Sequence, residues 1–172
     1  MLAGLHPATG TVSLDGVPLP AGAQARFRAG VAHIPEDRIH SGTVPSMTVA
    51  ENVALRQYDQ PPLARGLARD LGQVDDLARR EVAAYDVATP GIHTPSRLLS
   101  GGNIQKLILA RELAGSPKLI LAVHPTYGLD IGATDQVHLV LLERTQGGAG
   151  VLLVSEDPVS YTHLRAHETR HD

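Results

Sequence analysis

The sequence contains no cysteine, which excludes disulfide bonds and any zinc site built on thiolates. It also lacks a run of apolar residues near the roughly 20 that are needed to span a bilayer. The opening residues, MLAG, hold none of the positive charge with which a signal peptide begins. We therefore expect any association of this chain with a membrane to come through a partner protein.

An excess of positive charge is missing as well. The 15 lysine and arginine residues are outnumbered by 18 aspartate and glutamate residues, which gives a formal net charge of −3. No basic surface therefore indicates a nucleic-acid partner. Hydrophobic residues make up 42% and charged residues 19% of the 172 residues, which is typical of a globular domain with a substantial core and excludes extensive disorder.

The pattern G-x-x-x-x-G-K-[ST] occurs nowhere in the chain. In proteins that have it, the backbone N–H groups and the lysine of this loop bind the phosphates of a nucleotide. The chain therefore has no phosphate loop of its own.

The sequence does contain LSGGNIQK at residues 99–106, followed by apolar residues at helical spacing through residue 114. Ser100 can cap this helix, and Gly101 and Gly102 would let an anion approach the unpaired backbone N–H groups of its first turn. The helix dipole adds about half a positive charge there. The residues predict an anion site, although a Ser-Gly-Gly turn that only caps a helix is the competing interpretation.

The segments after this helix come in an informative order. An apolar strand is expected at 119–123, then HPTYGLD at 124–130, then a second helix, then an apolar strand at 151–154. This order resembles the nucleotide-binding domain of ABC transporters, with its LSGG signature, Walker B strand, D-loop and switch strand. The resemblance implies an α/β fold: an incomplete ABC-type P-loop NTPase fold, with a RecA-like parallel sheet and a helical signature subdomain, that is missing the Walker A segment.

The N-terminal residues fit the same family. Residues 2–5 (LAGL) precede a strand and tight turn expected over 11–17. In the ABC family such a segment follows the helix of the phosphate loop, so we expect that loop upstream of Met1 and infer a reading frame truncated at its 5′ end. A natural domain that never had the loop is the competing interpretation.

Residues 31–38 (VAHIPEDR) predict a short strand stopped by proline. Glu36 stands where the family has a glutamine near the magnesium ion. This PEDR resembles the second nucleotide-binding domain of the tandem ATPases that drive uptake of simple sugars and nucleosides. His33 is expected to be a structural histidine rather than a ligand.

Helices are expected over 46–55 and 75–85, with a break at 60–62. The charges of the second helix predict a solvated face. The residues of that helix expected to contact the core are Leu77, Val82 and Tyr85. The resemblance then divides the chain into a truncated N-terminal part of the ATPase core at 1–43, a helical subdomain ending in the signature at 44–100, the Walker B strand, D-loop and switch strand at 101–157, and a non-native tail at 158–172.

The chain departs from a working ATPase at its own catalytic positions. A hydrolysing domain ends the Walker B strand with Asp-Glu, where this chain has Val123 and His124. Valine cannot bind magnesium, and His124 could act as a base but is more simply structural. Glu156 replaces the histidine that senses the γ-phosphate, and an anion there repels phosphate. We therefore predict that the site formed by Glu36, Val123, His124 and Glu156 is degenerate.

The tail contains His163, His167 and His171, whose spacing of four would place them on one helical face and suggests a metal site. We reject that site, because the string after residue 158 does not continue the family pattern and resembles the translated read-through of a sequencing adapter. The tail is expected to have no packing role, and no metal site is expected in the chain.

In the ABC architecture two domains pair head to tail and each ATP lies between one phosphate loop and the other domain's signature. The residues expected to complete the partner's ATP site are Ser100, Gly101, Gly102 and Gln105. The D-loop residues expected at the contact between domains are Gly128, Leu129 and Asp130. The isolated chain is predicted neither to bind ATP tightly nor to hydrolyse it.

The resemblance implies ATP and Mg²⁺ as cofactors of the complete dimer. It implies as partners the first nucleotide-binding domain of the same polypeptide, two integral-membrane permease subunits and, indirectly, an extracytoplasmic solute-binding protein, with no nucleic acid. The expected location is peripheral, on the cytoplasmic face of the plasma membrane. Two alternatives remain open: a non-transport ABC ATPase, and a degenerate ABC domain that serves only to bind a partner.

Overall fold

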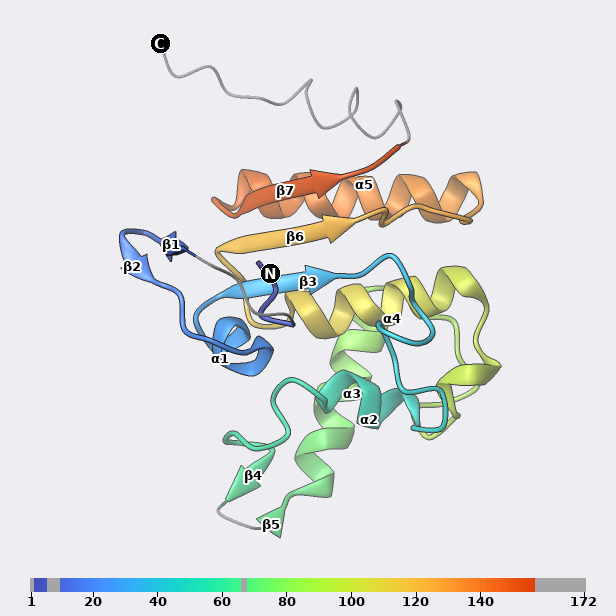
Figure 1. Ribbon diagram of the computed structural model, residues 1–172. Coiled ribbons are helices and arrows are strands. Elements are labelled where there is room, and N and C mark those ends of the chain that lie inside the picture. The colour runs from blue at the N-terminus through green and yellow to red at the C-terminus, as the bar shows by residue number, and fades with distance from the viewer. Residues whose placement is uncertain (1, 6–9, 66–67, 157–172) are drawn as a thin grey trace.

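The computed structural model describes residues 2–5, 10–65 and 68–156. The predicted tail at 158–172 lies outside the described residues. A parallel sheet forms one layer, helices α4 and α5 pack against it, and α2 and α3 lie on the side of α4 away from the sheet (Figure 1). Within the described residues, no helix is long and apolar enough to cross a membrane.

The sheet has the strand order β3 (Val31–Ile34), β6 (Leu119–Val123) and β7 (Gly150–Val154), and both pairings are parallel. The three predicted strands are thus confirmed. β3 and β6 are short apolar runs, as expected for strands of a parallel sheet that is covered on both faces. The register pairs Val123 with Val154, so the carboxyl ends of the strands lie at one edge.

Two long helices begin near that edge. α4 (Gly101–Leu113) follows Ser100, and α5 (Ile131–Gln146) follows Asp130, and in each case the side chain of the preceding residue accepts a hydrogen bond from the first turn. Both helices confirm the predictions. Nearly every side chain of α4 after its first turn is buried, so α4 is a central helix enclosed between the sheet and the helical layer.

The helical layer differs in detail from the prediction. α2 (Val49–Ala54) begins three residues later than expected, because Thr48 forms a capping box with Glu51 and leaves the residues before it outside the helix. α3 (Leu71–Ala84) begins four residues earlier, capped by Asp70. The predicted solvated face of α3 is wrong at Glu81, which is only 7% exposed. Of the expected core contacts, Leu77 is buried, and Val82 and Tyr85 are partly buried against the core.

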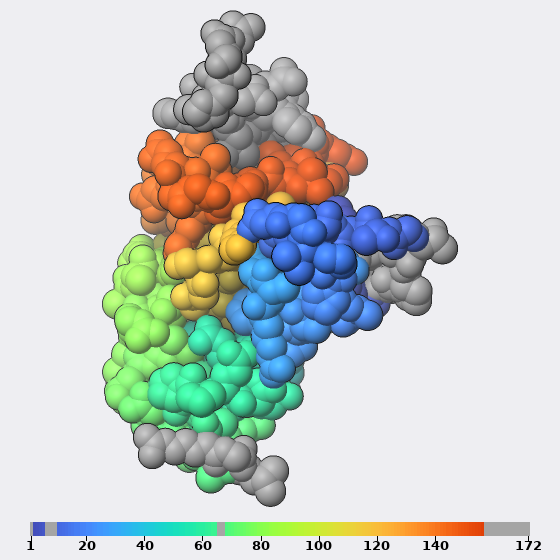
Figure 2. All heavy atoms as spheres, turned by 90° about the vertical axis from the view of Figure 1, so that its left-hand side faces the viewer, coloured from blue at the N-terminus to red at the C-terminus, as the bar shows by residue number. Residues whose placement is uncertain are grey.

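The remaining elements are short. The predicted strand and turn near the N-terminus form a hairpin, and a second hairpin follows α2. These elements are β1 (Ser13–Leu14), β2 (Val17–Pro18), α1 (Ala23–Arg28), β4 (Ala64–Arg65), β5 (Ala68–Arg69) and the 3₁₀ turn η1 (Ser96–Leu98). Figure 2 shows the β1–β2 hairpin and α1 (blue) projecting from the face opposite the carboxyl edge of the sheet, between the helical layer (green) and β7 (red).

A buried asparagine shapes the path of the chain toward the signature. Asn52 is fully buried; its Oδ1 accepts a hydrogen bond from Val44 N (2.9 Å), and its Nδ2 donates to Val44 O (3.1 Å) and to Ser96 Oγ (3.2 Å). It thereby ties α2 to the 3₁₀ turn four residues before Ser100. Because one amide satisfies several backbone groups, the loop before α4 has a fixed position.

A buried ionic network joins the layers at the other end of α4. Glu112 is 0% exposed, and its Oε1 accepts hydrogen bonds from the Nε atoms of Arg56 and Arg111, each at 2.9 Å. Its Oε2 accepts the N–H of His33 in β3 at 3.2 Å. Arg56 also lies over the ring of Phe27, 5.5 Å from its centroid. Burial alone would raise the pKa of Glu112, but Arg111 and Arg56 outweigh it and hold that pKa below its ordinary value.

His33 makes the stability of the chain depend on pH. Burial lowers its pKa from 6.5, against the opposing pull of Glu112. The folded protein therefore holds His33 neutral while the unfolded chain binds a proton, so the free energy of unfolding is expected to fall as the pH drops below about 6.5. Urea unfolding at about seven pH values, half a unit apart between pH 8 and pH 5, checks this. His33→Gln is expected to flatten that part of the profile, and an unchanged slope in this variant would contradict the assignment.

Candidate functional site

The first turn of α4 forms an exposed, polar surface. Ser100 and Gly101 are exposed, and no atom lies within 4 Å of the point where a Cβ on Gly101 would stand. There is thus open space beside Gly101 at the N-terminus of a helix of 13 residues, where the N–H of Asn103 donates to Ser100 Oγ at 3.4 Å. Gly102 is closer to its neighbours, since a Cβ there would lie 3.4 Å from that of Ala133 at the start of α5.

Asn103 is a site residue that the sequence analysis missed. Its Nδ2 donates to Ser100 Oγ at 2.9 Å, and its Oδ1 accepts the N–H of Ala88 at 2.8 Å. It therefore fixes the Ser100 hydroxyl as an acceptor and ties the signature to the loop after α3. The sequence did contain a signal for this contact, because the residue three places after a helix-capping serine lies beside the capping hydroxyl.

Gln105 does not share this surface. It is 1% exposed, and neither its Oε1 nor its Nε2 has a hydrogen-bond partner among the described residues. The contact of Gln105 with a nucleotide stays a prediction. In this structure its side chain is buried away from the exposed residues Ser100 and Gly101. The reason is the position of α4, which is enclosed on nearly all sides beyond its first turn, so that a polar residue there is buried regardless of its type.

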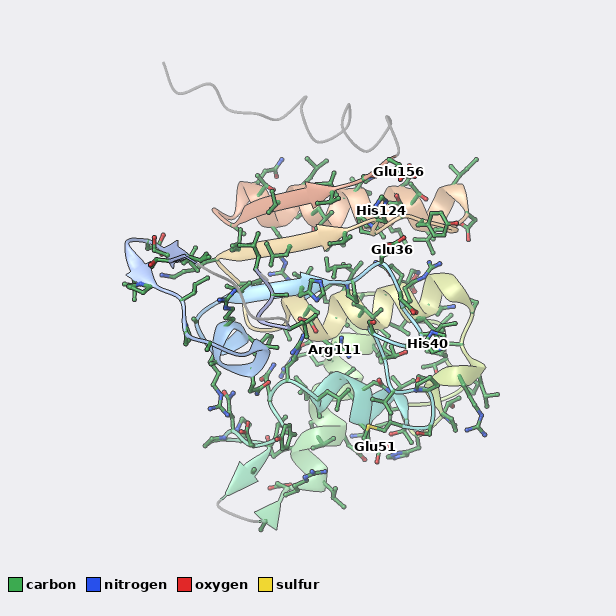
Figure 3. The ribbon with its side chains drawn as sticks, viewed as in Figure 1. Glu36, His40, Glu51, Arg111, His124 and Glu156 are labelled. Carbon is green, nitrogen blue, oxygen red and sulfur yellow. The ribbon has the colours of Figure 1, made fainter. Side chains whose placement is uncertain are left out.

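The residues predicted to form the degenerate site lie at the carboxyl edge of the sheet. Glu36 follows β3, His124 follows β6 and Glu156 follows β7, and Figure 3 shows all three near that edge. Glu36 and Glu156 are exposed, while Val123 and His124 are partly buried. His124 has a left-handed φ of 42° and donates its N–H to Val154 O at 2.7 Å, so it turns the chain out of the strand.

This edge does not fit a magnesium ion. Val123 occupies the end of β6 with a side chain that offers no oxygen, and the described residues include no group of three histidine, aspartate or glutamate side chains able to hold a metal. Glu36 and Glu156 add two carboxylates to this edge of the sheet, and their negative charge would repel an anion placed there.

The D-loop lies beside the signature. Tyr127 is exposed, Leu129 packs partly against the core, and the Asp130 carboxylate accepts the N–H of Ala133 at 2.9 Å as the cap of α5. Because Ala133 also faces Gly102, the first turns of α4 and α5 are neighbours. The structure therefore brings the predicted signature and D-loop residues together on one end of the molecule.

The comparisons with known proteins all indicate the same family. The family model described as ABC transporter matches residues 1–127. The chain is 38% identical over 148 residues to the guanosine import ATP-binding protein NupO of Bacillus subtilis, covering 86% of this chain and 29% of that protein. It is 41% identical over 125 residues to the nucleoside import ATP-binding protein NupA of Lactococcus lactis, covering 73% and 25%. It is 38% identical over 161 residues to a putative ribose/galactose/methyl galactoside import ATP-binding protein of Agrobacterium fabrum, covering 90% and 31%.

A solved structure supports the fold. The dimeric, post-hydrolysis structure of the ATP-binding cassette MJ0796 bound to ADP and Pi superposes with a TM-score of 0.74 at 22% identity, covering 94% of this chain and 69% of that one. The predicted α/β fold with a parallel sheet, of the ABC ATPase type, is thereby confirmed. The chain spans between 25% and 31% of the length of the curated relatives named above. The chain belongs to the ABC transporter family of ATP-binding proteins.

Proposed function

We propose that this chain is part of the second ATP-binding domain of a tandem ATPase that drives import of a simple sugar or a nucleoside. Two relatives, at 38 and 41% identity, are import ATP-binding proteins for guanosine and nucleosides, and a third, at 38%, is named as a putative sugar import ATP-binding protein. Each is more than three times as long as the matched segment, which leaves room for a first domain. The PEDR at residues 35–38 resembles the second domain of such proteins.

The signature is proposed to act on a nucleotide held by the first domain. Ser100 and Gly101 are exposed at the start of α4, with open space beside Gly101, and this is the single observation that favours this role. Backbone N–H groups and a serine hydroxyl placed at the γ-phosphate would stabilise the charge that develops there during phosphoryl transfer. Gly102, which lies close to Ala133, is proposed to offer its backbone N–H at the same helix end.

The chain's own half of the ATP site is proposed to be degenerate. Val123 cannot hold Mg²⁺, and Glu36 and Glu156 oppose a phosphate. Each complete dimer would then contain a site completed by Ser100 that turns over and a second site that does not. ATP and Mg²⁺ would be bound by the complete dimer.

The partners that follow from this proposal are the first ATP-binding domain of the same polypeptide, two permease subunits in the membrane and, through them, an extracytoplasmic solute-binding protein. The domain would lie peripherally on the cytoplasmic face of the membrane. The import functions in the names of the relatives support these partners. The transported solute would be chosen by the permease and the solute-binding protein.

The test is a hybrid protein in which residues 1–156 of this chain replace the aligned segment of the Bacillus subtilis guanosine import ATP-binding protein. The hybrid is expected to hydrolyse ATP and to associate its domains in the presence of ATP. A hybrid that folds but has no ATP turnover would reject the signature-in-trans proposal. ATP-dependent association without turnover would favour the binding-module alternative.

The isolated chain gives a complementary result. We expect no release of phosphate from ATP above background and no tight ATP binding by calorimetry, because the chain has neither a phosphate loop nor a magnesium ligand at Val123. The conclusion would be overturned by turnover in the purified chain that disappears in the Ser100→Arg variant.

A further inference from the structure

The loop after β3 is fastened to the signature helix. Thr43 Oγ1 donates a hydrogen bond to the carbonyl oxygen of Arg38 at 2.9 Å. A Cβ on Gly42 would lie 2.6 Å from Ile108 Cδ1 of α4 and 2.7 Å from the Arg38 carbonyl oxygen. Since only glycine fits between them, the backbone of Arg38 is held at a fixed position against α4.

The side chain of Arg38 reaches the D-loop. A Cβ on Gly128 would stand 3.4 Å from Arg38 Nη2, and Gly128 has a left-handed φ of 64°. The carboxylate of the neighbouring residue, Asp37, is directed elsewhere and accepts the N–H groups of Ile39 and His40 at 3.0 and 2.9 Å. Arg38 therefore extends from a backbone fixed to α4 into contact with the loop that precedes α5.

The guanidinium of Arg38 is not fully satisfied in this arrangement. Its Nη1 is buried and has no hydrogen-bond partner among the described residues. Burial lowers the pKa of Arg38 below its ordinary value, as expected for a charge removed from water without an acceptor. The loop beside it offers acceptors, because in the described part of the chain the carbonyl groups of Tyr127 and Gly128 accept no backbone hydrogen bond.

We propose that Arg38 is a positioning residue that sets the distance between the signature helix and the D-loop. Its backbone moves with α4, its guanidinium lies against Gly128, and its unpaired N–H donates to a loop carbonyl when the loop moves toward it. A buried N–H that lacks an acceptor favours such a movement, because leaving the group unpaired costs free energy. The functional meaning of this distance rests on the proposed function, in which both elements face the first domain.

Amide hydrogen exchange on the full chain tests this without nucleotide or partner. In Arg38→Met the backbone amides of Tyr127 and Leu129, which donate to His124 O and Thr126 O, are expected to exchange about five- to tenfold faster, since the loop loses its contact. Global stability in urea is expected to stay the same or to rise, because the variant removes a partly buried charge whose Nη1 has no hydrogen-bond partner among the described residues. If Arg38 served only to stabilise the fold, its replacement by methionine would instead lower the global stability.

The controls separate the guanidinium from other effects. Arg97→Met removes an exposed arginine of η1 and is expected to leave exchange in the D-loop unchanged. Arg38→Lys keeps the charge but loses the planar donors, and exchange as fast as in Arg38→Met supports the proposal. The proposal is overturned if Arg38→Met leaves the Tyr127 and Leu129 amides as protected as in the parent chain, or if Arg38→Lys exchanges like the parent. Loss of ATP turnover in the hybrid protein bears on the proposed function, not on this result.

Discussion

Replacing Ser100 by aspartate in the hybrid protein is expected to lower kcat for ATP hydrolysis by about 100- to 1000-fold, the range found when one donor to a developing oxyanion is lost. Aspartate caps a helix as well as serine does, and its charge suits a helix N-terminus. The fold of α4 is therefore retained. The same carboxylate, however, would stand where the γ-phosphate of the partner's nucleotide approaches and would repel it. Steady-state phosphate release measures the effect.

A matched control adds the same charge elsewhere. Ser13 is an exposed residue of β1, at the opposite end of the molecule from the signature (Figure 1). Ser13→Asp is expected to retain the kcat of the hybrid within about twofold, because substitutions of exposed residues away from the core, the helix caps and the functional site have small effects. If the Ser100→Asp hybrid and the parent hybrid were both folded and had equal kcat values, Ser100 would have no role in the ATP site.

The parts of this fold that were predictable from sequence depend on local patterns. The strands at 31–34 and 119–123 are apolar runs bounded by proline or by turn residues, and these features are visible in a window of a few residues. The start of α4 was predictable for the same reason, since a serine before two glycines and an apolar helical run is a local signal. The order of these segments then indicated the family, and the signature and D-loop meet because that topology requires it.

The parts that were missed depend on contacts between distant segments. Gln105 and Glu81 have polar side chains that predict exposure, yet each lies on a helix that other elements enclose. The contact between Arg38 and Gly128 joins residues 90 positions apart in the chain. No pattern within either segment predicts this contact, since Arg38 and Gly128 come together only when β3 and β6 lie side by side.

The ionic network around Glu112 is the most consequential of these long-range contacts, and Glu112→Ala is expected to lower the free energy of unfolding by about 3–5 kcal/mol. The variant leaves Arg111, itself buried, and Arg56 without the carboxylate that both now contact at 2.9 Å, and it opens a space in the interior. An uncompensated buried cation accounts for most of the expected cost. Urea unfolding at pH 7 measures it.

Two further variants distinguish an ion-pair effect from simple loss of volume. Glu143→Ala shortens an exposed glutamate of α5 and is expected to change the free energy of unfolding by no more than about 0.5 kcal/mol. Replacing Glu112, Arg111 and Arg56 together by methionine removes all three charges at once and is expected to recover most of the loss, because a packed apolar cluster needs no counter-charge. If the triple variant were no more stable than Glu112→Ala, the loss would come from hydrogen bonds that both variants lack, such as the one from His33 N, and the account of an unpaired charge would fail.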